Sequence, residues 1–346
     1  MSTRTFVIAE AGVNHNGSEE LALRLVDAAA QSGADAVKFQ TFTADKLVRP
    51  GAAKAAYQAQ ATGADGDQLS MLRQLEMSEA LHRRLFARCD ERGIEFMSTP
   101  FDIEAAQFLI GLGMRRIKVP SGEITNHPFL RALTALDRPL IVSTGMSTLD
   151  EIVEALAVIE AERRRRGRQG ALADRVTVLH CTSNYPTAAA DVHLRAMQSI
   201  AAATSLPVGY SDHTLGVAVS TAAVALGARV IEKHFTLDRA MSGPDHQASL
   251  TVDELASLVQ QVRTVEQALG SAEKAPTAGE LPVRELVRRS VTTCRDVPAG
   301  APIVDADLCL LRPGTGIAPK DLAAVVGRVA RRALPAGSTV QWGDLL

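Results

Sequence analysis

Apolar and polar positions follow a repeating pattern from residue 5 to about residue 265. Short β-branched runs that end in polar residues alternate with Ala- and Leu-rich stretches of helical spacing. Continuous apolar strands that alternate with helices are typical of a parallel sheet buried on both faces. Eight such units in about 260 residues favour a (β/α)8 TIM barrel over an open doubly wound sheet. The predicted strands span residues 5–12, 35–41, 94–100, 115–122, 139–145, 176–184, 206–214 and 228–235.

The pattern changes near residue 270, where the chain becomes rich in Ala, Gly and Pro. Beyond it, short strand-like runs are broken by PAG and RPGTG turns. We therefore predict a barrel over 1–270, a linker over 271–284 and a small mixed α/β domain over 285–346. Within the barrel, residues 46–74 are too many for an ordinary strand-to-helix loop, and long loops of this kind often cover a functional site.

Composition limits the kinds of partner. The 346 residues are 46% apolar and 22% charged, with a formal net charge of −2, so no overall field attracts nucleic acid or an anionic membrane. The chain shows neither a secretory signal nor a run approaching the roughly 20 apolar residues of a membrane helix. The cysteines lie far apart without a CxxC pair, which is typical of reduced thiols in the cytoplasm. Any anionic ligand must therefore be bound by a local cluster of cations.

Two lysines, Lys38 and Lys118, lie inside otherwise apolar predicted strands. Buried lysines are rare unless they are paired, and in a barrel the carboxyl ends of the strands converge on the active site. One such lysine could form a Schiff base. Two of them, together with hydroxyl groups, suit a ligand that carries a phosphate and a carboxylate. The hydroxyl residues at the predicted strand ends are Thr99, Ser121, Ser143, Ser183 and Ser211.

Two histidines, His213 and His234, end neighbouring predicted strands. A histidine pair this far apart in sequence is more often structural, but its position beside Asp212 and Glu232 favours a site for one divalent cation. Imidazole suits first-row metals, and two protein ligands leave positions open for water and substrate. Glu123 follows a Pro-Ser-Gly turn, where a carboxylate can act as a general acid or base or support a helix N-terminus.

Several longer motifs carry a resemblance to a known family. They are IAEAGVNHNG, AVKFQTF, FMSTPFD, IKVPSGEITN, VSTGMSTLDEI, LHCTSNYPT, GYSDHTLG, IEKHFTLD, GPDHQASL and, near the C-terminus, RPGTGI. With these motifs the chain resembles the bacterial sialic acid synthases, which include N-acetylneuraminate and legionaminic acid synthases. The resemblance extends over nearly the full length.

The resemblance implies an enzyme that condenses phosphoenolpyruvate with an N-acylated amino sugar. It implies a barrel followed by an antifreeze-protein-like (SAF) domain, which caps the barrel of the partner in a domain-swapped homodimer. It also implies a divalent metal, usually Mn²⁺, with Mg²⁺ or Co²⁺ as alternatives. His213 and His234 match the metal ligands, and Glu123 matches a catalytic acid or base.

The substrate-binding residues are implied by the same matches. The positions that match the phosphoenolpyruvate site are Lys38, Thr99, Lys118, Ser121, Ser143, Ser183 and Ser211. The positions that match the sugar site are Glu10, Gln40, Tyr185, Asp245 and Arg312, the last reaching the acyl group from the partner subunit.

Several alternatives remain open at this point. The sugar is either 2,4-diacetamido-2,4,6-trideoxymannose or N-acetylmannosamine: the stretches around KAAYQ and VRRSVTT resemble the legionaminic branch, whereas residues 187–190 depart from the common family pattern. Another metal-dependent barrel aldolase or hydrolase is a second hypothesis. A non-enzymatic sugar-binding protein is a third.

Overall fold

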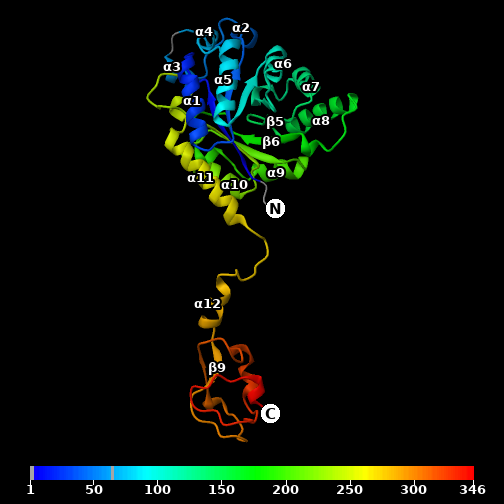
Figure 1. Cartoon of the computed structure of the whole chain (residues 1–346). Coiled ribbons are helices and arrows are strands. Elements are labelled where there is room, and N and C mark those ends of the chain that lie inside the picture. The colour runs from blue at the N-terminus through cyan, green and yellow to red at the C-terminus, as the bar shows by residue number, and fades with distance from the viewer. Residues whose placement is uncertain (1–3, 64–65) are drawn as a thin grey trace. The chain divides into compact units, whose positions relative to one another are not determined.

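The computed structural model describes residues 4–63 and 66–346, except for the side chains of residues 57, 60 and 61. The chain forms two compact units, Met1–Gly270 and Ser271–Leu346 (Figure 1). Among the described residues, no helix combines the length and apolar character needed to cross a membrane.

The first unit contains eight parallel strands. Neighbouring strands pair in the order β3-β2-β1-β8-β7-β6-β5-β4, and the two end strands, β3 and β4, are in contact, so the ring closes into the predicted barrel. Each strand overlaps one of the eight segments predicted from the sequence. The strands are β1 (Phe6–Gly12), β2 (Ala36–Thr41), β3 (Glu95–Pro100), β4 (Ile117–Val119), β5 (Leu140–Ser143), β6 (Val176–Cys181), β7 (Val208–Asp212) and β8 (Val230–His234).

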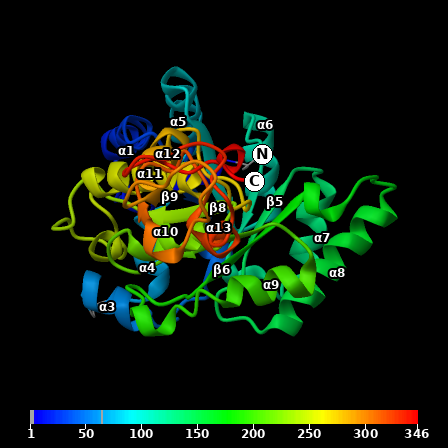
Figure 2. The same ribbon diagram turned by 90° about the horizontal axis from the view of Figure 1, so that it is seen from below.

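A long helix follows each strand and covers the outside of the barrel, as α7, α8 and α9 do beside β5 and β6 (Figure 2). Helix α8 begins with a capping box, in which Thr148 Oγ1 accepts from the Glu151 amide at 3.3 Å and the Glu151 carboxylate accepts from the Thr148 amide at 2.7 Å. Such a cap stabilises a helix by about 1 kcal/mol. The covering helices are α1 (Glu19–Gln31), α5 (Glu79–Arg92), α6 (Ile103–Leu112), α7 (His127–Ala135), α8 (Leu149–Arg165), α9 (Ala196–Thr204), α10 (Ala218–Ala225) and α11 (Val252–Leu269).

The long segment after β2 contains three short helices, α2 (Ala44–Leu47), α3 (Ala56–Thr62) and α4 (Gln68–Arg73). Part of this segment lines a polar cavity of about 310 Å³ together with residues that follow β1 and β8. Its role as a cover for the functional site stays a prediction.

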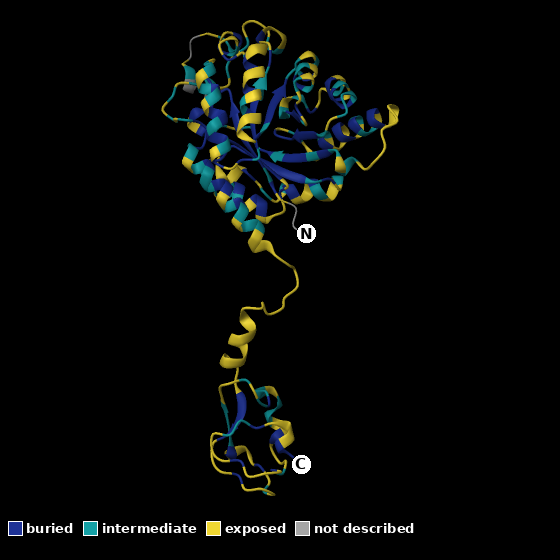
Figure 3. Ribbon diagram, viewed as in Figure 1, coloured by how far each residue is buried: buried dark blue, intermediate teal, exposed yellow. Residues whose placement is uncertain are grey.

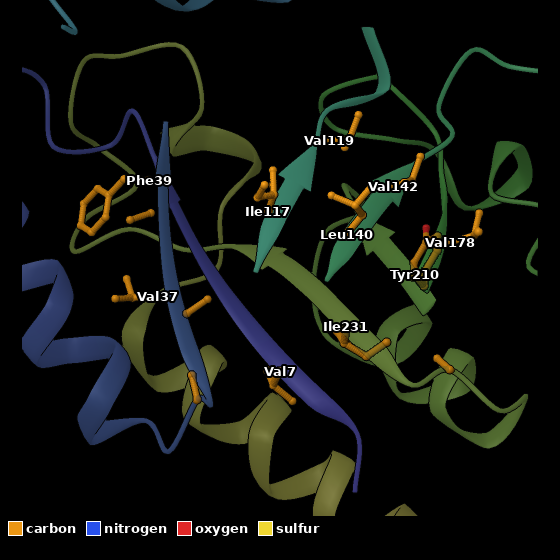
Figure 4. Close-up of a cluster of buried hydrophobic side chains, with 14 of the residues drawn as sticks. Val7, Val37, Phe39, Ile117, Val119, Leu140, Val142, Val178, Tyr210 and Ile231 are labelled. Carbon is orange, nitrogen blue, oxygen red and sulfur yellow. The ribbon is translucent and has the colours of Figure 1, made fainter. Parts of the chain in front are cut away.

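The strands alternate between two environments because successive side chains point to opposite faces. Val7, Val37 and Ile231 face the surrounding helices and belong to the main hydrophobic core, which Figure 4 shows in part. The opposite faces point into the barrel. There, the apolar side chains of Ile8, Ala36, Met97, Ile141, Leu179 and Val230 form a separate buried cluster, which we call the lower layer.

The second unit has a hydrophobic core of its own. This core includes Val291, Ile303 and Leu334, and the antiparallel strands β9 (Ser290–Thr293) and β10 (Leu308–Leu311) pair beside it. Helix α13 (Leu322–Val325) also belongs to this unit.

The segment predicted as a linker is partly helical. Helix α12 (Glu280–Val287) begins within it, where the Glu280 carboxylate accepts from the Thr277 amide at 2.8 Å and from the Thr277 hydroxyl at 3.0 Å. The helix is exposed along its length (Figure 3). Helix α12 therefore extends across the predicted boundary between the linker (271–284) and the small domain (285–346), and these domain limits stay a prediction.

Candidate active site at the mouth of the barrel

A cavity of about 250 Å³ opens at the carboxyl ends of the strands. Its walls are the inner faces of the barrel, directly above the lower layer. The structure brings most of the predicted site residues together here, namely Glu10, Lys38, Gln40, Thr99, Lys118, Ser121, Ser143, Ser183, Tyr185, Ser211, His213 and His234.

The two lysines are buried and paired with carboxylates. Lys38 Nζ lies 2.7 Å from Glu10 Oε2 and 3.6 Å from Glu232 Oε2, and it donates to Thr99 Oγ1 at 2.9 Å. Lys118 Nζ donates to Glu232 Oε1 at 2.9 Å. Two cations and two carboxylates therefore share one buried compartment, and their mutual pairing offsets the cost of burying each charge.

The two carboxylates of this compartment differ in their protonation. Burial works to raise the pKa of Glu232, but the charges of Lys118 and Lys38 and the Ser211 hydroxyl at 2.9 Å outweigh it and hold that pKa below its usual range. Burial raises the pKa of Glu10 to about 7, although Lys38 opposes the rise. Within this compartment Glu232 therefore favours the charged form, whereas Glu10 holds a proton more readily than an exposed carboxyl group does.

Glu232 was not among the residues predicted for the site, although it stood out beside His234. Alternation along β8 could have identified it, because residues 232 and 234 share the inward face. Phe101, Met146 and Cys181 also line the cavity without having been predicted.

Gly145 leaves room among the hydroxyl groups. A β-carbon at this position would overlap Ser183 Oγ and lie 2.9 Å from Ser121 Oγ and 3.2 Å from Cys181 Sγ. Nearby, Ser143 Oγ is buried without a hydrogen-bond partner among the described residues. A buried hydroxyl that lacks a partner is costly unless a ligand satisfies it, so this wall is suited to binding polar oxygens.

The two histidine rings lie beside each other, with centroids 5.4 Å apart, and the Tyr185 ring centroid is 4.0 Å from that of His213. His213 Nδ1 donates to the Thr182 carbonyl at 2.8 Å. Burial works to lower the pKa of His213, but Cys181 and this hydrogen bond outweigh it and raise that pKa above its usual value. His234 Nδ1 is buried without a hydrogen-bond partner among the described residues and lies 3.8 Å from Asp245 Oδ2. Burial, followed by the neighbouring His213, lowers the pKa of His234 well below its usual value, so its ring is neutral.

These groups fit a divalent metal ion. Metal ligation needs imidazoles with a lone pair available. The lowered pKa of His234 favours that neutral form, whereas a metal ion would have to displace a more tightly held proton from His213. Within residues 4–63 and 66–346, no cluster of three or more His, Cys, Asp or Glu side chains is arranged to hold a metal. Two imidazoles would therefore leave the remaining positions to water and substrate.

Three predicted residues are placed differently. Asp245 contacts His234 but is not among the residues that line the cavity. Glu123 ends a short turn beyond β4, and its Oε2 accepts from Asn126 Nδ2 at 2.7 Å, whereas its neighbours Ser121 and Gly122 line the cavity. Arg312 belongs to the second unit.

Comparison with known proteins places this arrangement in a family. Residues 25–274 match the NeuB family, and residues 288–346 match the SAF domain. The chain belongs to the NeuB family. This confirms both the resemblance found in the sequence and the predicted order of a barrel followed by a SAF domain.

Several named proteins are similar in sequence to this NeuB-family chain. It is 51% identical to the N,N'-diacetyllegionaminic acid synthase of Legionella pneumophila, over 99% of this chain and 94% of the relative. It is 44% identical to the protein of the same name from Campylobacter jejuni, over 95% and 96% of the two chains. Among solved structures, the N-acetylneuraminic acid synthetase of Leptospira borgpetersenii is 31% identical with a TM-score of 0.70, over 82% of this chain and 90% of that one.

Proposed function

We propose that the chain condenses phosphoenolpyruvate with an N-acylated amino sugar to give a sialic-type nonulosonic acid and phosphate. The observation that carries the proposal is the buried pair Lys38 and Lys118 in a hydroxyl-lined barrel cavity, in a chain that shares 51% identity with a named N,N'-diacetyllegionaminic acid synthase. A metal-dependent hydrolase would need neither this cation pair nor phosphoenolpyruvate.

Phosphoenolpyruvate would bind by competing for the lysine side chains. Its phosphate and carboxylate can replace part of the ion pairing that Glu10 and Glu232 provide to Lys38 and Lys118. The hydroxyls of Ser121, Ser143 and Ser183, with those of Thr99 and Ser211, would supply the remaining donors. The cationic side chains and hydroxyl donors that an anion needs are thus already in position before the substrate binds.

The reaction joins the methylene carbon of phosphoenolpyruvate to the aldehyde carbon of the open-chain sugar. The former enol carbon becomes an oxocarbenium centre, water adds there and loses a proton, and phosphate departs with cleavage of the C–O bond. The aldehyde oxygen gains one proton and becomes a hydroxyl. Glu123 is the predicted acid or base, and Glu10 is a second candidate because its pKa of about 7 allows proton transfer near neutral pH.

A divalent metal, with Mn²⁺ as the first choice, belongs to the proposal. His213 and His234 would hold it, and the bound ion would polarise the aldehyde carbonyl as a Lewis acid. Tyr185 lies against both rings, and this contact supports its predicted role in binding the sugar.

We further propose the legionaminic branch, whose acceptor is 2,4-diacetamido-2,4,6-trideoxymannose. The test is phosphate release from phosphoenolpyruvate with Mn²⁺, with this sugar and N-acetylmannosamine in parallel, and with the product mass determined. We expect a larger kcat/KM for the diacetamido sugar. A larger value for N-acetylmannosamine would assign the other branch, and no release with either sugar from folded protein would refute the reaction.

The proposed assembly is a domain-swapped homodimer in which Arg312 serves the partner's site. Arg312→Ala and His213→Ala should each be inactive alone, but coexpression should restore activity, because a mixed dimer contains one intact barrel served by one intact arginine. Failure of the mixed dimer to regain activity would refute the role of Arg312 in trans. A fully active monomer in a size measurement would refute the swap itself.

A cytoplasmic location completes the proposal. The cysteines Cys89, Cys181, Cys294 and Cys309 are all free thiols, as expected in a reducing compartment. Cell fractionation that recovered the chain outside the cytoplasm would contradict this location.

A further inference from the structure

A buried ion pair lies directly behind the two histidines. Asp212 and Lys233 are register partners at the carboxyl ends of β7 and β8, and Lys233 Nζ is 2.9 Å from Asp212 Oδ2. Both side chains are 0% exposed. Each immediately precedes a histidine that lines the cavity, so strand alternation turns the pair away from the cavity toward the helices.

The pair is held by further hydrogen bonds. Asp212 Oδ2 accepts from Ser220 Oγ of α10 at 2.6 Å, and Asp212 Oδ1 accepts from the Thr214 amide at 2.8 Å. Lys233 Nζ also donates to the Thr214 carbonyl. Lys233 is therefore bonded to the residues on both sides of His213, while its own backbone leads directly into His234.

Stability alone does not explain these charges. Other outward positions on the same strands carry apolar or aromatic side chains, such as Tyr210 and Ile231, which belong to the main hydrophobic core. A buried ion pair is often no more stabilising than a well-fitted apolar pair of similar volume. Its particular effect is geometric, because it ties the end of β7 to the end of β8 at the residues that carry the imidazoles.

We propose that Asp212 and Lys233 are positioning residues that set the separation of the His213 and His234 rings and so determine the affinity of the metal centre. This inference rests on the proposed metal site. In metal sites generally, residues that lie behind the ligands fix the orientation of the ligands, and mutating these residues lowers metal affinity by about 10- to 100-fold.

The experiment measures Mn²⁺ binding to the full-length protein by electron paramagnetic resonance, together with thermal unfolding. We expect Asp212→Asn and Lys233→Met each to raise the Kd for Mn²⁺ by about 10- to 100-fold. The matched control is Glu95→Gln. This substitution breaks the ion pair between Glu95 Oε1 and Arg116 Nε, 2.7 Å apart at the amino-terminal ends of β3 and β4, and should leave the Kd unchanged.

The double variant Asp212→Asn/Lys233→Met separates positioning from stability. Removing both charges avoids leaving one buried charge alone, so thermal stability should return toward that of the wild type, while Mn²⁺ affinity should stay weakened. The visible spectrum of bound Co²⁺ should also change in this variant, because its intensity reports the ligand geometry.

Two outcomes overturn the inference in distinguishable ways. If wild-type protein binds Mn²⁺ and the single and double variants bind it equally well, the pair has only a structural role. If wild-type protein binds no Mn²⁺, the metal centre itself is refuted, and the positioning role is refuted with it.

Discussion

The inside of the barrel changes character within two residues along a strand. On β1, Ile8 belongs to the apolar lower layer and Glu10 lines the cavity. On β2, Ala36 and Lys38 show the same change. Every second side chain of a strand points to the same face. The inward face of each strand therefore contributes an apolar side chain to the lower layer and, two residues later, a polar side chain to the cavity. Stability and activity are therefore separated along the barrel axis, and substitutions in the two layers should have different effects.

The largest effect on activity is expected at the histidines. His213→Ala or His234→Ala should reduce condensation by at least about 10³-fold, because several kcal/mol of carbonyl polarisation would be lost with the metal. Circular dichroism and thermal unfolding should show an intact fold. Exhaustive chelation of the wild type should have the same effect, and near-normal rates after chelation would remove the metal from the mechanism.

The next effect is expected at the cation pair. Lys118→Met should lower kcat/KM for phosphoenolpyruvate by about 10²–10³-fold, because it removes a buried charge aimed at the substrate anion. Steady-state phosphate release provides the measurement. Lys46→Met is the control, since the Lys46 side chain is half exposed and pairs with exposed Glu104, and a similar loss there would show that the assay reports net charge alone.

A smaller effect is expected from filling the cavity wall. Gly145→Ala should lower kcat/KM by about 10²-fold or less, because the added methyl group displaces the hydroxyls of Ser121 and Ser183. Gly111→Ala in α6 is the matched control, since an added β-carbon there meets nothing within 4 Å and Gly111 is not among the residues that line the cavity. Equal kinetics for the two variants would contradict the assigned function of Gly145.

The smallest effect on activity is expected in the lower layer. Leu179→Ala should reduce the free energy of unfolding by about 2–5 kcal/mol, because it leaves a cavity in a fully buried cluster. Denaturant unfolding measures this loss, and kcat/KM of the folded fraction should change little. A large kinetic defect without a stability defect would show that the two layers are not separable.

The sequence was sufficient to predict the barrel because its strands are continuously apolar and its helices are regularly spaced. It also singled out Lys38 and Lys118, because buried lysines are rare unless they are paired, and it predicted that they bind a phosphate and a carboxylate of a ligand. It did not identify Glu232 as their shared partner, because that pairing joins β2, β4 and β8 across the barrel. Contacts between distant strands depend on barrel geometry, which local patterns do not contain.

The outward ion pair illustrates the same limit. Asp212 and Lys233 lie within two predicted strand ends, 206–214 and 228–235, where polar residues are expected to face the active site. The structure turns them to the opposite face, because each is one residue out of phase with the histidine that follows it. A shift of one residue along a strand reverses the face to which a side chain points. The side that a strand-end residue faces is therefore easily misassigned from sequence.

Among the residues that the structure describes, the core of the second unit and the core of the barrel have no member in common. A module with an independent interior can be exchanged during evolution, or by the protein engineer, without repacking its neighbour. Residues 271–346 of this chain could thus be grafted onto the barrel of a relative with another sugar preference. Such chimaeras would reveal which module encodes the choice of sugar.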